Sequence, residues 1–131
     1  NIDLLIKAGK ILTLEGYDFK ISIYGRPVNR DSDISYNNEI RRQAISMISE
    51  KKIEFFDEVS NYKTPIIFNS HDIFVNMTNS GSLDKTVLEA MACGCLVIVS
   101  NKSFKGVLPE QLIFEEGNVE SLVESLKYAL F

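Results

Sequence analysis

Four consecutive apolar residues, Leu96 to Val99 (LVIV), narrow the possible folds more than any other feature of this chain. A strand with one face in water alternates apolar and polar residues, whereas an unbroken apolar run predicts a strand that is covered on both faces. Such strands are typical of parallel sheets, whose successive strands are joined by helical crossovers. The segment therefore predicts an α/β fold.

The rest of the chain alternates between helical and strand-like apolar spacing. We expect helices over residues 2–12, from near Ser35 to 48, 65–70, 83–93 and from 118 onward, and strands over 19–24, 53–56, 72–77, 96–99 and 112–115. Gly16 and Gly94 stand where two helices should end, while Thr64 and Asn118 are expected to cap two helix starts. This order predicts a Rossmann-like, doubly wound parallel sheet in three α/β/α layers.

The domain organisation follows from the absence of repeats, low-complexity tracts and linkers, which predicts one domain over residues 1–131. The chain opens on a helix, whereas a doubly wound domain normally opens on a strand against which the first helix packs. We therefore expect that this first strand is missing upstream of Asn1 and that the chain is a fragment.

Composition excludes several classes of function. The net charge of -4 provides no basic surface for nucleic acid or an anionic membrane. The longest apolar run is far shorter than the roughly 20 residues of a membrane span, and we expect no secretory leader, because Asn1 opens directly into an amphipathic pattern. Cys93 and Cys95 are expected to be buried thiols in a reducing cytoplasm. With only His71 to join them, and His71 itself expected to cap or pack at a helix end, no metal or other cofactor is predicted.

The best candidate site is the junction over residues 77–89 (MTNSGSLDKTVLE), which leads from an apolar strand into a helix. Gly81 and Ser82 allow a ligand to approach the backbone, and the amides of the first helical turn can hold phosphate or sugar oxygens. Lys85 lies in that turn, and Glu89 lies one turn later on the same face. Apolar neighbours indicate a specific partner for this carboxylate. Two alternatives to a binding site remain. The junction can be a tight turn whose serine only caps the helix, and Lys85 and Glu89 can form an ordinary exposed ion pair.

The string LEAMACGCLVIVS (residues 88–100), preceded by GSLDKTV, resembles the signature of group 1 glycosyltransferases, which are retaining enzymes with the two-domain GT-B fold. Residues 5–25, 53–59, 64–82 and 112–130 are similar to other segments of the same family. The resemblance covers essentially the whole chain. It implies the C-terminal domain of a GT-B enzyme, which binds a UDP-, GDP- or ADP-linked sugar for glycan or polysaccharide biosynthesis.

The resemblance also implies roles for individual residues. Glu89 matches a glutamate that binds the ribose hydroxyls, Val59 falls where the backbone meets the base, and Gly25 lines the same cleft. The stretch that would hold the donor sugar and diphosphate contains Gly81, Ser82, Leu83, Asp84, Lys85 and Thr86.

One position departs from the family pattern, because Gly81 stands where the first signature glutamate would contact the transferred sugar. Asp84 or Lys85 are the candidates to take over this catalytic contact. The family's basic clamp for the diphosphate and its acceptor-binding N-terminal domain would precede Asn1. The chain by itself is therefore expected to bind donor weakly and to catalyse nothing.

The mechanism implied is displacement of a nucleoside diphosphate from an activated sugar, by positioning and charge stabilisation. The main alternative is a catalytically silent GT-B-like domain that binds a nucleotide or a protein partner. A phosphoacceptor receiver domain lacks its acidic cluster after Tyr24, and no GxGxxG motif supports a dinucleotide site. The expected location is cytoplasmic, at the inner face of a membrane if the missing half binds there.

Overall fold

The computed structural model describes residues 2–24, 31–56, 63–77 and 85–130, with the backbone alone at 31–34, 36 and 37. Contacts divide the chain into two compact units, an N-terminal unit (Ile2–Ser60) and a C-terminal unit (Asn61–Phe131). Each is described by itself.

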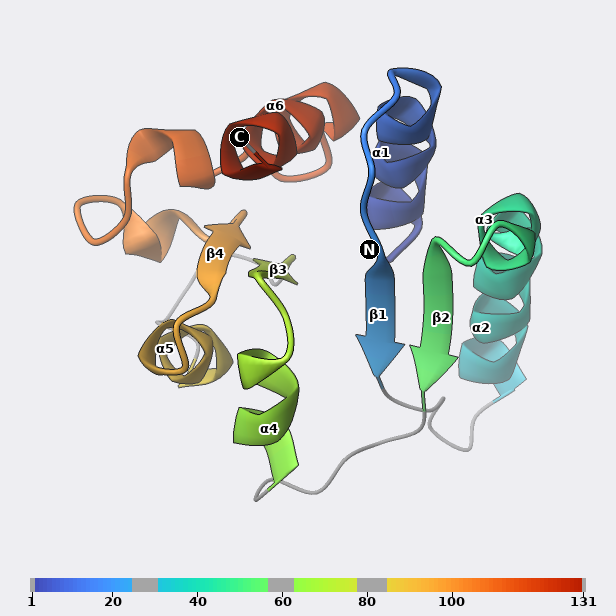
Figure 1. Ribbon diagram of the computed structural model, residues 1–131, viewed down its shortest axis with the longest axis horizontal. Helices are drawn as coiled ribbons and strands as arrows, with labels where there is room; N and C mark the ends of the chain where they lie inside the picture. Colours follow the sequence, from blue (N-terminus) through green and yellow to red (C-terminus); the bar gives the residue numbers. More distant parts are fainter. Residues whose placement is uncertain (1, 25–30, 57–62, 78–84, 131) are drawn as a thin grey trace. The chain divides into compact units, whose positions relative to one another are not determined.

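The N-terminal unit is built on one pair of parallel strands (Figure 1). Its elements are α1 (Ile2–Leu14), β1 (Ile21–Tyr24), α2 (Asp31–Gln43), α3 (Ile45–Ser49) and β2 (Ile53–Phe56). The strands pair in register from Ile21 with Ile53 to Tyr24 with Phe56. Two parallel neighbours joined by helices confirm the predicted α/β connection in this unit.

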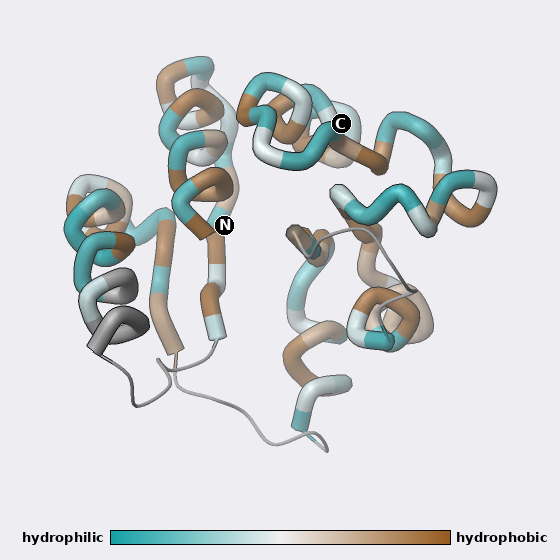
Figure 2. The backbone as a smooth tube through the Cα atoms, turned by 180° about the vertical axis from the view of Figure 1, so that it is seen from behind, coloured by the Kyte–Doolittle hydropathy of each residue, from teal (hydrophilic) through white to brown (hydrophobic). Residues whose placement is uncertain are grey.

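The core of the N-terminal unit lies between its helices and one face of the strand pair. Buried side chains come from every helix and from β2, and they are Ile6, Ile40, Ala44, Met47 and Ile53. Ile21, Ile23 and Phe55 pack against this cluster. Because side chains alternate along a strand, Tyr24 and Phe56 belong to the opposite face. The helices alternate between teal and brown in Figure 2, as expected for helices with one apolar side.

The C-terminal unit is built on a second parallel pair. Its elements are α4 (Thr64–Asn69), β3 (Ile73–Asn76), α5 (Lys85–Ala92), β4 (Leu96–Val99), the 3-10 helices η2 (Lys102–Phe104) and η3 (Glu110–Leu112), and α6 (Val119–Leu130). The strands pair from Ile73 with Leu96 to Asn76 with Val99. The core cluster contains Phe68, Val87, Ala90, Cys95, Val97, Val99 and Phe104. As predicted, β4 is buried, except at Leu96, which is 39% exposed.

Three helices end in the same hydrogen-bonding pattern. After α5, the Gly94 amide donates to the Met91 carbonyl and the Cys95 amide to the Ala90 carbonyl, both at 3.0 Å. Gly94 and the corresponding Gly16 after α1 have φ of 87°, as a Schellman motif requires. The predicted stops at both glycines are confirmed. After α3 the same conformation falls on Lys51, with φ of 59°.

The helix expected from near Ser35 to residue 48 starts earlier than predicted and is divided into two helices, α2 and α3. It begins at Asp31, so Ser35 lies inside α2 and does not cap it. It is also divided at Ala44, whose ψ of 1° separates α2 from α3, although the Ile48 amide still bonds the Ala44 carbonyl at 2.9 Å. Ile48, expected in the buried stripe, is 40% exposed, because it follows the inward Met47 by one residue and so points about 100° away.

Two further boundaries are corrected. Thr64 is the first residue of α4 and Lys63 is its N-cap, so the predicted cap is displaced by one residue. The strand expected over residues 112–115 is reduced to a single parallel bridge from Ile113 to Val99. It goes no further because the Glu115 amide donates to Ser121 Oγ at 2.8 Å. The predicted Asn118 cap is confirmed, since Asn118 Oδ1 accepts from the Ser121 amide at 3.0 Å.

Candidate functional site

Helix α5 carries the residues of the predicted donor site that the structure describes. Lys85, Thr86 and Glu89 are all exposed on it. The remaining predicted residues, Gly25, Val59, Gly81, Ser82, Leu83 and Asp84, lie outside the described residues. The structure therefore brings together Lys85 and Glu89 on the outer side of one helix, and their predicted roles stay predictions.

The side of α5 that faces outward follows from its buried residues. Val87 and Ala90 are fully buried against the core of the C-terminal unit. Glu89 lies two residues after Val87, which turns its side chain about 200° away from that core. Within the described ranges Glu89 has no side-chain hydrogen bond or ion pair, including none to Lys85. The apolar residues around Glu89 in the sequence indicated a specific partner for its carboxylate. The described residues do not provide that partner.

Buried polar residues lie at the carboxyl ends of β3 and β4, where ligands bind in open α/β sheets. Asn76 ends β3, and Ser100 and Asn101 follow β4. The Ser100 amide bonds the Asn76 carbonyl at 3.2 Å, and Asn101 Oδ1 accepts from the Ser103 amide at 2.9 Å to cap η2. Sequence reasoning did not single out these residues, although their position after apolar strands was a usable signal. Their contacts show that they order the ends of the strands.

A pair of aromatic residues marks the carboxyl ends of β1 and β2. The rings of Tyr24 and Phe56 stack with centroids 4.7 Å apart and an interplanar angle of 12°. Tyr24 is 37% exposed, and it is the most exposed residue of β1. Sequence reasoning missed this pair too, because only the register brings the two residues together. The sole signal in the sequence is that both strands end in an aromatic residue.

His71 and Cys95 close the carboxyl end of α4. His71 Nδ1 lies 2.8 Å from the Ile67 carbonyl oxygen, and Cys95 Sγ donates to the Phe68 carbonyl at 3.0 Å. Burial raises the pKa of the Cys95 thiol, with a smaller effect from the charges of Cys93 and Asp72. The predicted capping role of His71 and the burial of Cys95 are confirmed, whereas Cys93 is half-buried. Across the described ranges, no three His, Cys, Asp or Glu residues are grouped to hold a metal ion.

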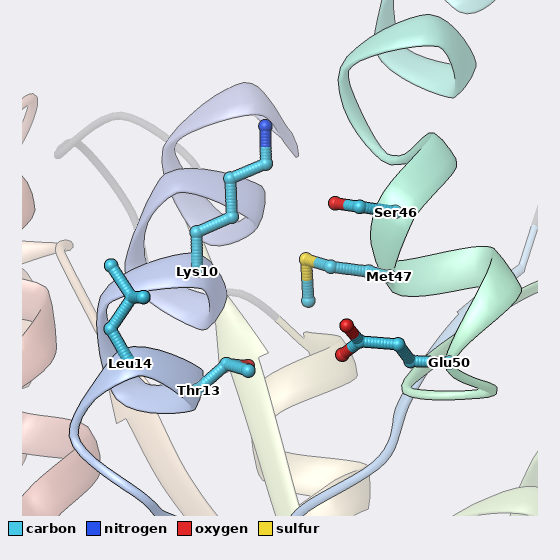
Figure 3. Close-up of a pocket in the computed structure, with 6 residues that line it drawn as sticks. All are labelled: Lys10, Thr13, Leu14, Ser46, Met47 and Glu50. Atoms are coloured by element: carbon cyan, nitrogen blue, oxygen red, sulfur yellow. The ribbon is translucent and has the colours of Figure 1, made fainter.

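A cavity of about 250 Å³ opens between α1 and α3 (Figure 3). Its lining residues are Lys10, Thr13, Leu14, Ser46, Met47 and Glu50. These residues lie toward the ends of the two helices that lead into β1 and β2, which places the cavity at the amino edge of that strand pair. Ligands of parallel sheets bind at the opposite, carboxyl edge, so this cavity is not the predicted donor site.

Gly9 leaves room for the end of the Met47 side chain next to this cavity. A Cβ atom at Gly9 would lie 2.7 Å from Met47 Cε and 3.1 Å from Ile21 Cδ1. Met47 therefore forms both the contact with α1 and one wall of the cavity. We assign the cavity to the packing of these two helices.

None of the helices in the described part of the chain is long and apolar enough to cross a membrane.

Comparisons with known proteins agree with the resemblance seen in the sequence. A crystal structure of a glycosyltransferase from Rickettsia africae ESF-5 matches with a TM-score of 0.74 at 18% identity, over 96% of this chain. The chain spans 33% of the length of that protein, and the likeness shows a shared fold. No curated protein matches the chain. The family model described as glycosyl transferases group 1 matches residues 1–130, and the chain therefore belongs to that family.

Proposed function

We propose that the protein carrying this chain is a retaining glycosyltransferase of glycan or polysaccharide biosynthesis, and that this chain binds its nucleotide-sugar donor. The observation that carries the proposal is the family match, which extends over residues 1–130. The parallel strand pairs support it, because such sheets place ligands at the carboxyl ends of their strands.

Glu89 is the residue on which the proposal depends most. In this proposal its carboxylate accepts hydrogen bonds from the two ribose hydroxyls of the donor. Its exposure on α5 leaves the carboxylate accessible, and the described residues offer it no competing hydrogen bond or ion pair. A carboxylate that accepts two hydroxyl bonds contributes about 1.5–3 kcal/mol per bond, so its removal should weaken binding strongly.

The donor phosphates need local positive charge, because the chain has a net charge of -4. In this proposal the amides that open α5, together with the Lys85 ammonium, bind the diphosphate and stabilise its charge as it leaves. Asp84 or Lys85 contacts the transferred sugar in place of the glutamate that Gly81 replaces. The backbone at Val59 meets the base, and Gly25 lies at the turn that lines the same cleft. The acceptor is bound by another domain of the full-length protein.

A second function is favoured by Gly81 alone. In this alternative, a protein without the first signature glutamate retains donor binding and lacks transfer, as a catalytically silent member of the family does. Release of nucleoside diphosphate from a donor sugar by the full-length protein distinguishes the two functions. Steady release that Glu89→Ala abolishes supports the enzyme, whereas binding without release supports the silent domain.

The first experiment is a calorimetric titration of the full-length protein with UDP, GDP and ADP. We expect one of the three to bind, and Glu89→Ala to weaken it by roughly tenfold or more. Glu124→Ala is the matched control, since it removes an exposed carboxylate from α6 and should leave binding unchanged. Equal affinities for wild type and Glu89→Ala would contradict the assigned role, and absence of any nucleotide binding would contradict the function.

A further inference from the structure

The cavity between α1 and α3 carries charged groups that the packing of the two helices does not need. Gly9 and Met47 make the packing contact, since a Cβ atom at Gly9 would lie 2.7 Å from Met47 Cε. Lys10 and Glu50 line the same cavity and are exposed. Within the described ranges, neither side chain makes a hydrogen bond or an ion pair, including none to the other. Both charges therefore remain available to a ligand.

Each helix contributes one charged group and one hydroxyl to the cavity. Lys10 and Thr13 come from α1, and Ser46 and Glu50 come from α3 and its C-cap. In Figure 3, Lys10 and Ser46 lie toward one end of the cavity, Thr13 and Glu50 toward the other, and the Met47 side chain between them. The cavity thus has a cationic end, an apolar middle and an anionic end.

The hydrogen-bonding groups at the two ends differ in the same sense as the charges. The Lys10 ammonium only donates, and the Ser46 hydroxyl, which has no hydrogen bond among the described residues, can donate as well. At the other end, the Thr13 hydroxyl already donates to the Gly9 carbonyl at 2.8 Å, which leaves its lone pairs to accept. The Glu50 carboxylate only accepts. The first end therefore suits a carboxylate, and the second suits an ammonium group.

The middle of the cavity suits an aliphatic chain. Met47 is only 2% exposed, while Leu14, which lines the same cavity, is 88% exposed. A ligand chain in the cavity removes apolar surface of both side chains from water, and a thioether adapts readily to such contacts. The volume of about 250 Å³ lies just below the range of about 300–1,000 Å³ that is typical of small-molecule pockets, so the ligand must be short.

We propose that this cavity binds a short aliphatic zwitterion, a molecule with a carboxylate at one end and an ammonium group at the other. Its carboxylate accepts hydrogen bonds from Lys10 and Ser46, and its ammonium group donates to Thr13 and Glu50. Both helices belong to the N-terminal unit, and the cavity lies at the amino edge of β1 and β2. The site is therefore separate from the proposed donor site, and the inference does not depend on the proposed function.

The test uses 6-aminohexanoate as the probe and the full-length protein with ¹³C-labelled methionine methyl groups. The Met47 methyl signal, assigned by its loss in Met47→Leu, should shift on titration and saturate with a Kd on the order of 1 mM. Hexanoate and hexylammonium each carry only one of the two charges, so each should bind roughly three- to tenfold more weakly. The Met91 methyl on α5 lines another part of the molecule and should not shift.

Variants at the two charged ends identify the groups that bind the probe. Lys10→Met and Glu50→Gln should each weaken binding roughly three- to tenfold. Lys7→Met is the matched control, because it removes an exposed lysine of α1 that does not line the cavity, and it should leave affinity unchanged. The double variant Lys10→Glu with Glu50→Lys should regain affinity, since a zwitterion can bind in the reversed direction.

A Met47 methyl signal that does not move would overturn the inference. Equal affinities of the wild type for 6-aminohexanoate and for hexanoate would overturn it too, and this comparison requires no variant to fold. Unchanged affinity in both Lys10→Met and Glu50→Gln would show that the probe binds without the two charges. None of these results depends on nucleotide binding, so the inference and the proposed function are tested separately.

Discussion

The two thiols around Gly94 sit in different surroundings although only one residue separates them. Cys95 is buried and donates its S–H to the Phe68 carbonyl, with the His71 carbonyl 3.4 Å away. Only the neutral thiol can donate, and desolvation raises its pKa further from the physiological range. Cys93 is half-buried at the end of α5. Their reactivity should therefore differ even though both are free thiols.

We predict that Cys93 reacts with iodoacetamide well before Cys95 in the native protein, as followed by mass spectrometry. The raised pKa also affects stability: the contribution of the neutral thiol is present below the pKa of the unfolded thiol, about 8.5, and is lost as the pH rises through the folded value. Urea unfolding at pH 7 and pH 10 should show a smaller decrease for Cys95→Ala than for the wild type. Equal alkylation rates for both thiols would refute the prediction.

Residues whose surroundings are local could be predicted from the sequence. The stops at Gly16 and Gly94 and the cap at Asn118 depend on hydrogen bonds within a few residues, which the local sequence specifies. The Tyr24–Phe56 pair depends on the register between two strands, which local sequence does not reveal. At Glu89, the composition of the neighbours suggested a partner, whereas the helical period places the carboxylate on the outer side.

The end of α3 differs from the ends of α1 and α5 in one respect. The Lys51 amide donates to the Ile48 carbonyl at 3.0 Å and the Lys52 amide to the Met47 carbonyl at 2.8 Å, which is the pattern seen at Gly16 and Gly94. A side chain in the left-handed region costs roughly 1–2 kcal/mol, because its Cβ crowds the following carbonyl oxygen. The helix thus ends at the same motif with a less suitable residue.

We predict that Lys51→Gly raises the free energy of unfolding by about 0.5–1 kcal/mol, after the larger entropy of an unfolded glycine is subtracted. Urea denaturation of the two proteins measures the difference. Lys51→Ala is the control, since it removes the charge and keeps the Cβ, and it should leave stability close to that of the wild type. Gly94→Ala makes the reverse change and should destabilise. Lower stability in Lys51→Gly would show that the Lys51 side chain contributes more than its conformation costs.

The types of most elements were predictable because their apolar periodicity is strong, while some boundaries depended on contacts that periodicity does not encode. Residues 112–115 have strand-like composition, but the Ser121 hydroxyl binds the Glu115 amide and the pairing ends after one bridge. The apolar stripe of Ile40, Ala44 and Met47 stays buried across the division at Ala44. The apolar periodicity of the sequence therefore does not reveal that the helix is divided there.

At the scale of the molecule, each compact unit has its own buried cluster. Ile6, Ile40 and Met47 contribute to the first cluster, and Val87, Val99 and Phe104 to the second. A cluster confined to one unit stabilises the strand pair with which it packs. The two clusters do not test the prediction of one domain over residues 1–131. That prediction depends on whether the two units unfold cooperatively.

We predict that Phe104→Ala, at a fully buried side chain, lowers the stability of the C-terminal unit by about 3–5 kcal/mol. Native-state hydrogen exchange at the β4 amides measures the loss, and the β1 and β2 amides should keep most of their protection. Val107→Ala, at an exposed position, should change exchange in neither unit. An equal loss of protection in both strand pairs would show that the chain unfolds as one cooperative domain.

The parallel pairing has a consequence for how the chain folds during its synthesis. Neither strand pair can close through a hairpin, because β1 and β2, like β3 and β4, are separated by at least one helix along the chain. Each pair must wait for its crossover, which slows folding relative to local pairing. Both strands of the first pair, however, are translated before α4 and leave the ribosome before the end of the C-terminal unit does. The N-terminal unit can therefore begin to fold while the C-terminal unit is still being made.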